Sequence, residues 1–186
     1  MRVFIALPLP FDVQDQLEAL QDGLSVGRPV AAEQMHITLA FFADVAPQPL
    51  SDLNDALEDV RAYTFDVEFS GLDVFGGAKP RLLAEMVRPS PELDHLHRAV
   101  QSAARLAGLE ARRQRFRPHV TLFRFGARLP AHLPMALQGF LSDKAARPVS
   151  SFVADRMTMM QSTLGGAAPV YDLLAEYPFH PIPSGD

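Results

Sequence analysis

Hydrophobic and polar residues follow two different periods along the first part of this chain. Residues 2–9 are almost all apolar and end at prolines, which predicts a strand buried on both faces. Strand-like composition returns over 35–42 and again over 63–72. Between the strands, apolar residues recur at helical spacing in two stretches. The first contains Val13, Leu17, Leu20 and Leu24, with Gly23 and Gly27 at its end, and the second contains Leu50, Leu53, Leu57 and Val60.

The second part of the chain repeats this order of elements. Ser90 is suited to cap a helix whose apolar stripe runs from Leu93 to Ala104, and Gly108 supplies a left-handed residue after its end. A later helical pattern over 133–140 is weaker because Pro134 lies within it. The strands of this part are predicted over 81–87, 118–125, 149–159 and 170–177.

Two segments of the form His-x-Thr-Leu lie at equivalent places in these repeats. His36 and His119 are separated by 119 − 36 = 83 residues, and nearly the same offset superposes strand on strand and helix on helix. We therefore expect a duplicated α+β unit, with halves of about 1–75 and 76–186 joined by a loop over 71–80. Two lobes related by a pseudo-twofold axis would turn the paired motifs toward each other across a cleft.

Composition narrows the chemistry. With 186 residues and 48% hydrophobic residues, the chain is long enough to bury its own core. It has no cysteine, which excludes disulfides, thiolate zinc sites and a thiol nucleophile. No apolar stretch approaches the ~20 residues of a membrane span. We expect a cytoplasmic monomer that does not associate with membranes, with a disordered end over 183–186.

Charge is distributed unevenly. The net charge of −5 rules out a diffuse positive field that would attract nucleic acid. However, residues 111–142 contain no Asp or Glu, and this stretch surrounds the second histidine segment. Its arginines are Arg112, Arg113, Arg115, Arg117, Arg124 and Arg128. They form either a local RNA contact or a solvated basic face.

The repeated segments suggest a pair of acid and base groups. Because side chains alternate along a strand, His36 and Thr38 project to one face while the aliphatic residues between them anchor the strand. The same holds for His119 and Thr121. Two imidazoles on opposite sides of one phosphorus atom can accept and donate protons without a metal, and each threonine hydroxyl can donate to a phosphate oxygen.

A structural role is the main alternative for either histidine alone, since a single strand histidine is more often a packed or surface residue. The repetition of the segment is what favours function. A metal site is a weaker interpretation, because neither segment has a neighbouring carboxylate or the helical His-Glu-x-x-His spacing. We expect neither metal nor cofactor.

At these segments the sequence resembles the 2H phosphoesterase superfamily, and within it the RNA 2′,3′-cyclic phosphodiesterases, also called the bacterial 2′-5′ RNA ligase family. The resemblance extends from residues 2–7 to the region of Tyr171. It implies a bilobal fold, with two antiparallel sheets around a central cleft and helices outside. It also implies that His36 is the proton donor and His119 the acceptor, that RNA with a 2′,3′-cyclic phosphate end is the partner, and that 2′-5′ RNA ligation is the reverse reaction.

Strand alternation suggests further contacts. It puts Phe42 and Phe123 on the cleft face, where either could stack on a base or pack in the core. It also groups Arg115 and Arg117 with His119 as candidate RNA contacts. Arg124 matches an arginine of the family and is a candidate phosphate ligand together with Thr38 and Thr121, although alternation turns it away from the cleft unless the strand bulges.

The leading hypothesis is hydrolysis of RNA 2′,3′-cyclic phosphate ends to 2′-phosphomonoesters. Two alternatives stay open. One keeps the fold but uses a small substrate, such as a cyclic nucleotide or an ADP-ribose cyclic phosphate. The other is an RNA-end-binding module without turnover.

Overall fold

A computed structural model describes residues 1–110, 115–145, 147–166 and 168–182. The predicted arginine contacts at Arg112 and Arg113, and the disorder predicted for 183–186, lie outside this range. The helices are α1 (Phe11–Leu20), α2 (Pro47–Glu58), α3 (Pro91–Leu106) and α4 (Leu133–Lys144), with a short 3-10 turn at Ala32–Gln34. The strands are β1 (Val3–Pro8), β2 (Arg28–Pro29), β3 (His36–Phe42), β4 (Phe65–Val67), β5 (Phe69–Phe75), β6 (Leu82–Val87), β7 (His119–Arg124), β8 (Phe152–Ala154), β9 (Arg156–Gly165) and β10 (Ala168–Pro178).

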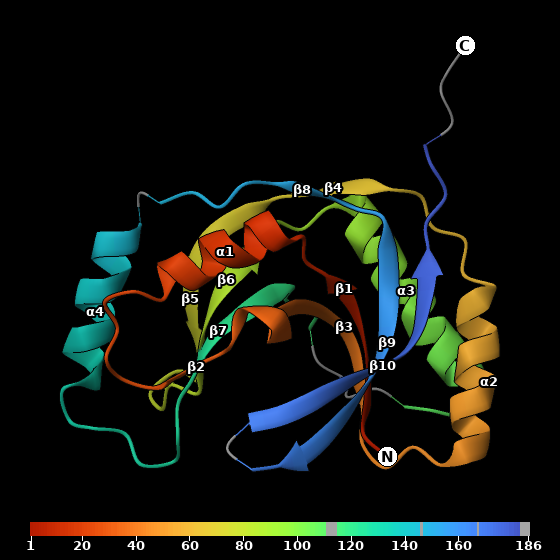
Figure 1. Cartoon of the computed structure of the whole chain (residues 1–186), viewed down its shortest axis with the longest axis horizontal. Coiled ribbons are helices and arrows are strands. Elements are labelled where there is room, and N and C mark those ends of the chain that lie inside the picture. The colour runs from red at the N-terminus through yellow and green to blue at the C-terminus, as the bar shows by residue number, and fades with distance from the viewer. Residues whose placement is uncertain (111–114, 146, 167, 183–186) are drawn as a thin grey trace.

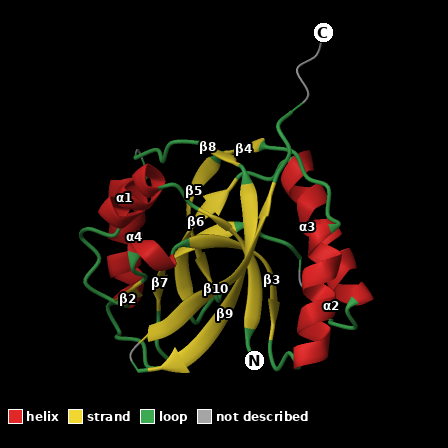
Figure 2. Ribbon diagram, turned by 45° about the vertical axis from the view of Figure 1, so that its right-hand side comes forward, coloured by secondary structure: helices red, strands yellow, loops and turns green. Residues whose placement is uncertain are grey.

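An eight-stranded antiparallel sheet dominates the fold. Its order is β10-β9-β1-β3-β7-β6-β5, with β2 paired to β7 outside this path, and a small second sheet consists of β4 and β8. The α1 and α4 helices lie at one side of the strands, and α2 and α3 lie at the opposite side (Figures 1 and 2). The predicted α+β class with antiparallel sheets and outer helices is therefore confirmed.

The two parts of the main sheet meet at one residue pair. Ile37 of β3 pairs with Val120 of β7, and these residues are themselves separated by 120 − 37 = 83 positions. A residue that pairs with its own counterpart lies on the pseudo-twofold axis. The axis therefore passes between the two His-x-Thr-Leu segments, as the repeat required.

A later strand of each half of the chain pairs with the first strand of the other half. β9 pairs with β1, and β5 pairs with β6. The short strands that precede them, β4 and β8, pair with each other where the two segments cross. The single strands predicted over 63–72 and 149–159 are consequently each divided into two. The division of the chain at about residue 75 stays a prediction.

Turn and cap residues behave mostly as their chemistry requires. The Ser90 Oγ accepts a hydrogen bond from Leu93 N at 3.2 Å, and Gly108 has a φ of 70°. Pro134 lies in the first turn of α4, where its missing N–H costs nothing, so the helix forms despite it. The predicted loop over 71–80 is wrong in its first half. β5 continues to Phe75, and the turn that follows is a hairpin between β5 and β6.

The core lies between the sheet and the helices. The inward residues of β3 and β7, Ile37 and Val120, are fully buried, and the stripes of α1 and α3 pack in the same core cluster. The opposite face of β3 and β7 carries the half-buried histidines and threonines. Among the described residues, no helix is long and apolar enough to cross a membrane.

Candidate active site

The two histidines are held in the same way. His36 Nδ1 lies 2.8 Å from the carbonyl oxygen of Gln34, and His119 Nδ1 lies 2.7 Å from that of Arg117. A carbonyl oxygen only accepts hydrogen bonds, so Nδ1 donates in both rings. In the neutral state each ring therefore keeps an unprotonated Nε2, which is the atom available to take or give a proton.

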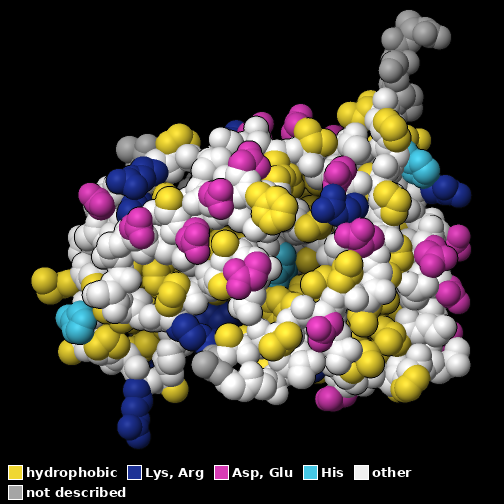
Figure 3. All heavy atoms as spheres, viewed as in Figure 1, with side chains coloured by type: hydrophobic (Ala, Val, Ile, Leu, Met, Phe, Trp, Pro, Cys, Tyr) yellow, Lys and Arg dark blue, Asp and Glu magenta, His cyan; other side chains and the backbone are white. Residues whose placement is uncertain are grey.

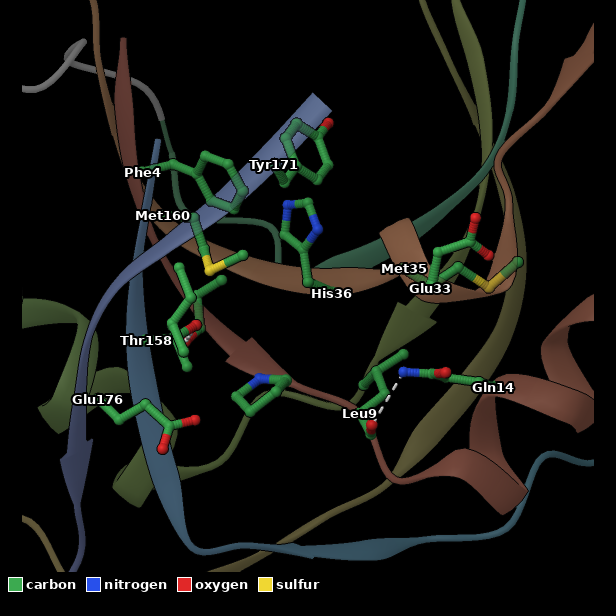
Figure 4. A pocket seen from close by; sticks show the side chains of 13 residues that line it. Phe4, Leu9, Gln14, Glu33, Met35, His36, Thr158, Met160, Tyr171 and Glu176 are labelled. Carbon is green, nitrogen blue, oxygen red and sulfur yellow. Dashed lines mark hydrogen bonds between the residues drawn. The ribbon is translucent and has the colours of Figure 1, made fainter. Parts of the chain in front are cut away.

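Aromatic side chains fix the plane of each imidazole. The Phe4 ring stacks on His36 with 4.6 Å between centroids, and Tyr171 meets His36 edge-on at 5.5 Å. Phe4 and Tyr171 also contact each other, with 4.9 Å between centroids, and Figure 4 shows His36 beside both rings. On the other side of the axis, Phe75 packs against His119 with 4.6 Å between centroids. Rigid packing of this kind preserves the geometry that proton transfer needs.

Burial favours the neutral form of both rings. Burial lowers the pKa of His36 to about 4, against the hydrogen bond to Gln34, and the charges of Arg124 and His119 lower it further. Burial also lowers the pKa of His119, against its hydrogen bond to Arg117, with the Arg117 and Arg124 guanidinium groups lowering it further. The charge of Arg124 thus acts on both imidazoles.

The antiparallel register brings the threonines to the level of the opposite histidines. Around the pair of Ile37 and Val120, Thr38 lies at the level of His119 and Thr121 at the level of His36. All four side chains are on the half-buried face of the sheet. The site therefore offers two Nε2 atoms and two hydroxyl donors around one pseudo-twofold axis.

A bulge in β3 and another in β7 change which residues after the histidines project into the cleft. The pairing register between β1 and β3 shifts at Ile5/Ala6, and that between β6 and β7 shifts at Leu83/Ala84. One residue is inserted opposite each shift, at Leu39/Ala40 and at its counterpart Leu122/Phe123, so the alternation of faces reverses beyond it.

Phe42 is the residue whose prediction fails for this reason. It is only 3% exposed and packs in the core, as does Phe123, whereas Phe41 is 38% exposed on the other face. The corresponding bulge in β7 turns Arg124 toward the cleft, where it lines a pocket together with His36 and Thr38. Arg124 and Phe41 are counterparts in the two halves, since 124 − 41 = 83.

Arg117 is exposed, but contacts with Asp73 and Phe75 hold it beside His119. Its Nη2 lies 2.6 Å from Asp73 Oδ2, and its guanidinium lies 4.3 Å from the centroid of the Phe75 ring. Because Phe75 in turn packs on His119, Arg117 contributes to the position of that imidazole. Arg115 is exposed in the segment before β7, and its RNA contact stays a prediction.

Two pockets flank His36. One contains Thr38 and Arg124, together with Arg2, Arg28 and Phe41. The other, in Figure 4, is bounded by Phe4, Met160 and Tyr171, with Glu33 and Glu176 at opposite sides. Sequence reasoning missed Phe4, Tyr171, Phe75 and Asp73. The position of Phe4 in the predicted first strand was the one available signal. The contacts of Tyr171, Phe75 and Asp73 depend on which strands pair, and the sequence pattern does not reveal that.

Within the described part of the chain, no group of three or more His, Asp or Glu side chains is arranged to hold a metal ion. The charged and titratable side chains nearest the two histidines include Arg124, with Arg2 and Arg28 in the same pocket, and Arg117 paired with Asp73. Its chemistry therefore has to be sought first in proton transfer and in hydrogen bonding to an anion.

Comparison with known proteins gives consistent matches. Residues 9–166 match the model of the 2′-5′ RNA ligase superfamily. A Geobacillus stearothermophilus protein named RNA 2′,3′-cyclic phosphodiesterase is 30% identical over 98% of this chain, which spans 58% of that protein's length. A protein of the same name from Aeropyrum pernix is 31% identical, with 87% of this chain and 93% of the relative covered.

Solved structures share the fold. Escherichia coli LigT complexed with ATP has a TM-score of 0.72 and 22% identity, with 96% of this chain and 98% of that chain covered. A Thermus thermophilus protein has a TM-score of 0.78 and 20% identity, with 97% and 99% covered.

Proposed function

Because the chain belongs to the 2′-5′ RNA ligase superfamily, we propose that it opens 2′,3′-cyclic phosphates at RNA ends and leaves 2′-phosphomonoesters. The observation that carries the proposal is the matched pair of imidazoles, each with Nδ1 donating to a backbone carbonyl. Relatives named RNA 2′,3′-cyclic phosphodiesterase support the choice of substrate.

In the proposed reaction a water molecule attacks phosphorus while His119 Nε2 accepts its proton. The bond from phosphorus to the ribose 3′ oxygen breaks, and His36 Nε2 donates a proton to that oxygen. One water is consumed, and the product carries a 2′-phosphate and a free 3′-hydroxyl. If the 5′-hydroxyl of a second RNA takes the place of the attacking water, the same bond from phosphorus to the 3′ oxygen breaks and the two RNA ends are joined through a 2′-5′ linkage. The two rings make the same hydrogen bond, so their geometry does not distinguish the proton donor from the acceptor. We therefore assign these roles from the resemblance of the two segments to the family.

Three side chains are assigned to the phosphate. The hydroxyls of Thr38 and Thr121 donate to its non-bridging oxygens, and Arg124 offers a guanidinium fork that matches two oxygens at once. The proximity of a guanidinium also compensates the charge that develops on the oxygens in the transition state. No step of this scheme draws on a metal or a cofactor.

The donor must first gain a proton, since burial holds the pKa of His36 at about 4. A bound phosphate anion supplies the missing favourable charge and offsets Arg124. We therefore infer that substrate binding itself protonates the donor. This makes the acid available only when a phosphate is in place.

The direct test incubates the purified protein, in EDTA, with an oligonucleotide that ends in 2′,3′-cyclic phosphate, and identifies the product by chromatography against 2′- and 3′-phosphate standards. His36→Ala and His119→Ala should each lower turnover by about 10²- to 10⁴-fold. His95→Ala, at an exposed position on α3, is the matched control. Turnover that appears only with added metal, or that survives either substitution, would contradict the mechanism.

The same experiment separates the two alternatives. A binding module would retain its RNA affinity in both alanine variants and show no turnover to lose. An enzyme for a small cyclic phosphate would turn over nucleoside cyclic phosphates as well as RNA ends, with only a shallow dependence on salt, because few phosphates are contacted.

We also propose that the protein acts in the cytoplasm as a monomer, away from membranes. The sequence has no cysteine, so no disulfide marks an oxidising compartment. Light scattering coupled to gel filtration tests the oligomeric state, and cell fractionation tests the location. A dimer at micromolar concentration, or recovery with the membrane fraction, would contradict it.

A further inference from the structure

Beyond the groups assigned to the reacting phosphate, the same pocket contains positive charge that the reaction does not use. Arg2 and Arg28 line it together with Arg124, and among its described lining residues there is no carboxylate. In Figure 3 a histidine lies below the surrounding surface near the centre of the face shown, with an Asp or Glu side chain next to it and Lys or Arg side chains farther away on the same face. This positive pocket belongs to a protein whose net charge is −5.

One of the arginines that line this pocket, Arg2, has an unsatisfied side-chain nitrogen. Its Nε is buried and, among the described residues, has no hydrogen-bond partner. Leaving a guanidinium N–H buried without an acceptor is costly, and a phosphate oxygen is the acceptor that this group fits best. The unsatisfied atom therefore favours an anionic ligand over a neutral one.

The position of Arg2 is fixed by its neighbours. Its carbonyl oxygen accepts a hydrogen bond from Ser162 N at 2.9 Å, which ties the start of β1 to β9. Its guanidinium lies 5.2 Å from the centroid of the Phe41 ring, an arrangement that holds the cation in place. Phe41 reaches this position because of the bulge in β3.

Charge balance points to a second anionic group. A cyclic phosphodiester carries one negative charge, which the charge of Arg124 alone balances, so a protonated His36 and Arg2 leave positive charge in excess. In an RNA chain, the next phosphate is attached to the 5′ oxygen of the same terminal nucleoside. A nucleotide whose ribose lies on the His36 side of the cleft therefore brings a second phosphate to the same part of the molecule.

We propose that Arg2, supported by Phe41 and with Arg28 on the adjoining wall, forms a subsite for the phosphate on the 5′ side of the terminal nucleotide. The subsite rests on the proposed function, and it narrows the substrate to nucleotides that carry a phosphate at both ends of the ribose. It makes the protein select RNA ends over nucleoside cyclic phosphates.

The experiment compares three substrates: a nucleoside 2′,3′-cyclic phosphate, the same compound with a 5′-phosphate, and a dinucleotide that ends in the cyclic phosphate. The protein should prefer the two compounds with the second phosphate by about tenfold or more in kcat/KM, which corresponds to one charge-assisted contact. Arg2→Gln should remove most of that preference, chiefly through KM. Arg98→Gln, an exposed arginine on α3, is the matched control and should leave the preference intact.

Salt gives a second readout of the same contact. For the dinucleotide, the slope of log affinity against log salt should fall by about 0.7 in Arg2→Gln, as expected for one lost phosphate contact to a single strand. Arg2→Lys keeps the charge but loses Nε and the fork, so it should recover only part of the preference. Near-native unfolding midpoints of these variants would exclude a loss of folding.

Failure of the subsite can be told apart from failure of the proposed function. Equal losses on all three substrates in Arg2→Gln, or no preference in the unaltered protein, would overturn the subsite while hydrolysis stands. Preference for the 5′-phosphorylated nucleoside but not for the dinucleotide would assign the site to a terminal phosphate and overturn its role on RNA chains. If nothing is hydrolysed, the subsite still requires that a nucleoside 2′,5′-bisphosphate bind about tenfold tighter than the 2′-monophosphate in calorimetry, with Arg2→Gln abolishing the difference.

Discussion

At the scale of single residues, two backbone carbonyls decide which nitrogen of each histidine is chemically active. The carbonyl groups of Gln34 and Arg117 lie two residues before the ring that they bind, so the backbone that leads into each strand sets the tautomer of the histidine. A side-chain partner would be lost by substitution, whereas a carbonyl cannot be removed. Both rings therefore present Nε2 whatever residue stands at position 34 or 117.

The first prediction concerns the proton on the donor. In the free protein the pKa of His36 is about 4 and that of His119 lies below 6.5, so the bell of kcat/KM against pH should lie on the acid side of 6.5. A bound phosphate raises the pKa of the donor, so the alkaline limb of kcat should lie at higher pH than that of kcat/KM. Proton NMR titration of the His36 ring, with and without a nucleoside 2′-phosphate, checks the shift. An unchanged titration would contradict it.

A second residue-scale prediction concerns Arg124. Its positive charge lowers the pKa of both histidines, so Arg124→Gln should raise both pKa values in the free protein while it lowers turnover by about 10²-fold or more through loss of a phosphate donor. The combination is diagnostic, because a substitution that merely distorts the cleft has no reason to move both titrations upward. NMR titration and kinetics on the same variant measure it, with Arg98→Gln as the control. Unchanged titrations would remove Arg124 from the site.

At the scale of elements, the bulges in β3 and β7 determine which side chains reach the cleft. The two register shifts occur at equivalent places. Beyond each shift, the residue that a regular strand would bury lies on the cleft face, and its neighbour is buried instead. Because of the bulges, an aromatic ring on one side of the axis and a guanidinium on the other share the face of the histidines. A regular strand would instead have buried Phe41 and Arg124 against the helices.

The bulge in β3 predicts opposite consequences for two adjacent phenylalanines. Phe42→Ala should destabilise the fold by about 3–5 kcal/mol, because it empties a buried site, and Phe41→Ala should cost much less. In return, Phe41→Ala should weaken binding of RNA ends, since Arg2 loses the ring beside it. Urea unfolding and kcat/KM, measured on both variants, give the comparison. Similar stability losses in the two variants would mean that the strand has no bulge.

The sequence was sufficient for what depends on local pattern. It predicted the four helices and the common face of His36, Thr38, His119 and Thr121, because these follow from periodicity within regular segments. It failed at Phe42 because a bulge depends on the pairing of β3 with β1, and neither Leu39-Ala40 nor Leu122-Phe123 carries a distinctive signature. The exchange of β5 and β9 between the halves and the contacts of Phe75 and Tyr171 are likewise properties of strand pairing.

At the scale of the whole molecule, the two faces of the main sheet carry ionisable groups whose pKa values shift in opposite directions. On the core face, Glu85 of β6 is 3% exposed, and its Oε1 accepts a hydrogen bond from Gly71 N at 2.8 Å. Burial raises the pKa of Glu85 from 4.5 to about 7, although that hydrogen bond lowers it. On the cleft face, burial lowers the pKa of His36 from 6.5 to about 4.

These shifts have opposite effects on stability as pH changes. Between about pH 4.5 and 7 the folded protein keeps a proton on Glu85 that the unfolded chain has released, so this group makes the fold less stable as pH rises. Between about pH 6.5 and 4 the unfolded chain protonates His36 while the folded protein does not, so this group makes the fold less stable as pH falls. Each effect amounts to about 3 kcal/mol at most, at ~1.4 kcal/mol per pKa unit.

The last prediction is that these two contributions cancel in the unaltered protein over their common range and separate in variants. Glu85→Gln, whose amide oxygen can still accept from Gly71 N, should make the free energy of unfolding rise with pH between 4.5 and 6.5. His36→Gln should make it fall over the same interval, less steeply because His119 still contributes in the opposite sense. Urea unfolding at several pH values checks both slopes. If Glu85→Gln ran parallel to the unaltered protein, the buried carboxyl would be titrating normally, and the cost of keeping neutral imidazoles at the site would have to be balanced elsewhere in the sheet.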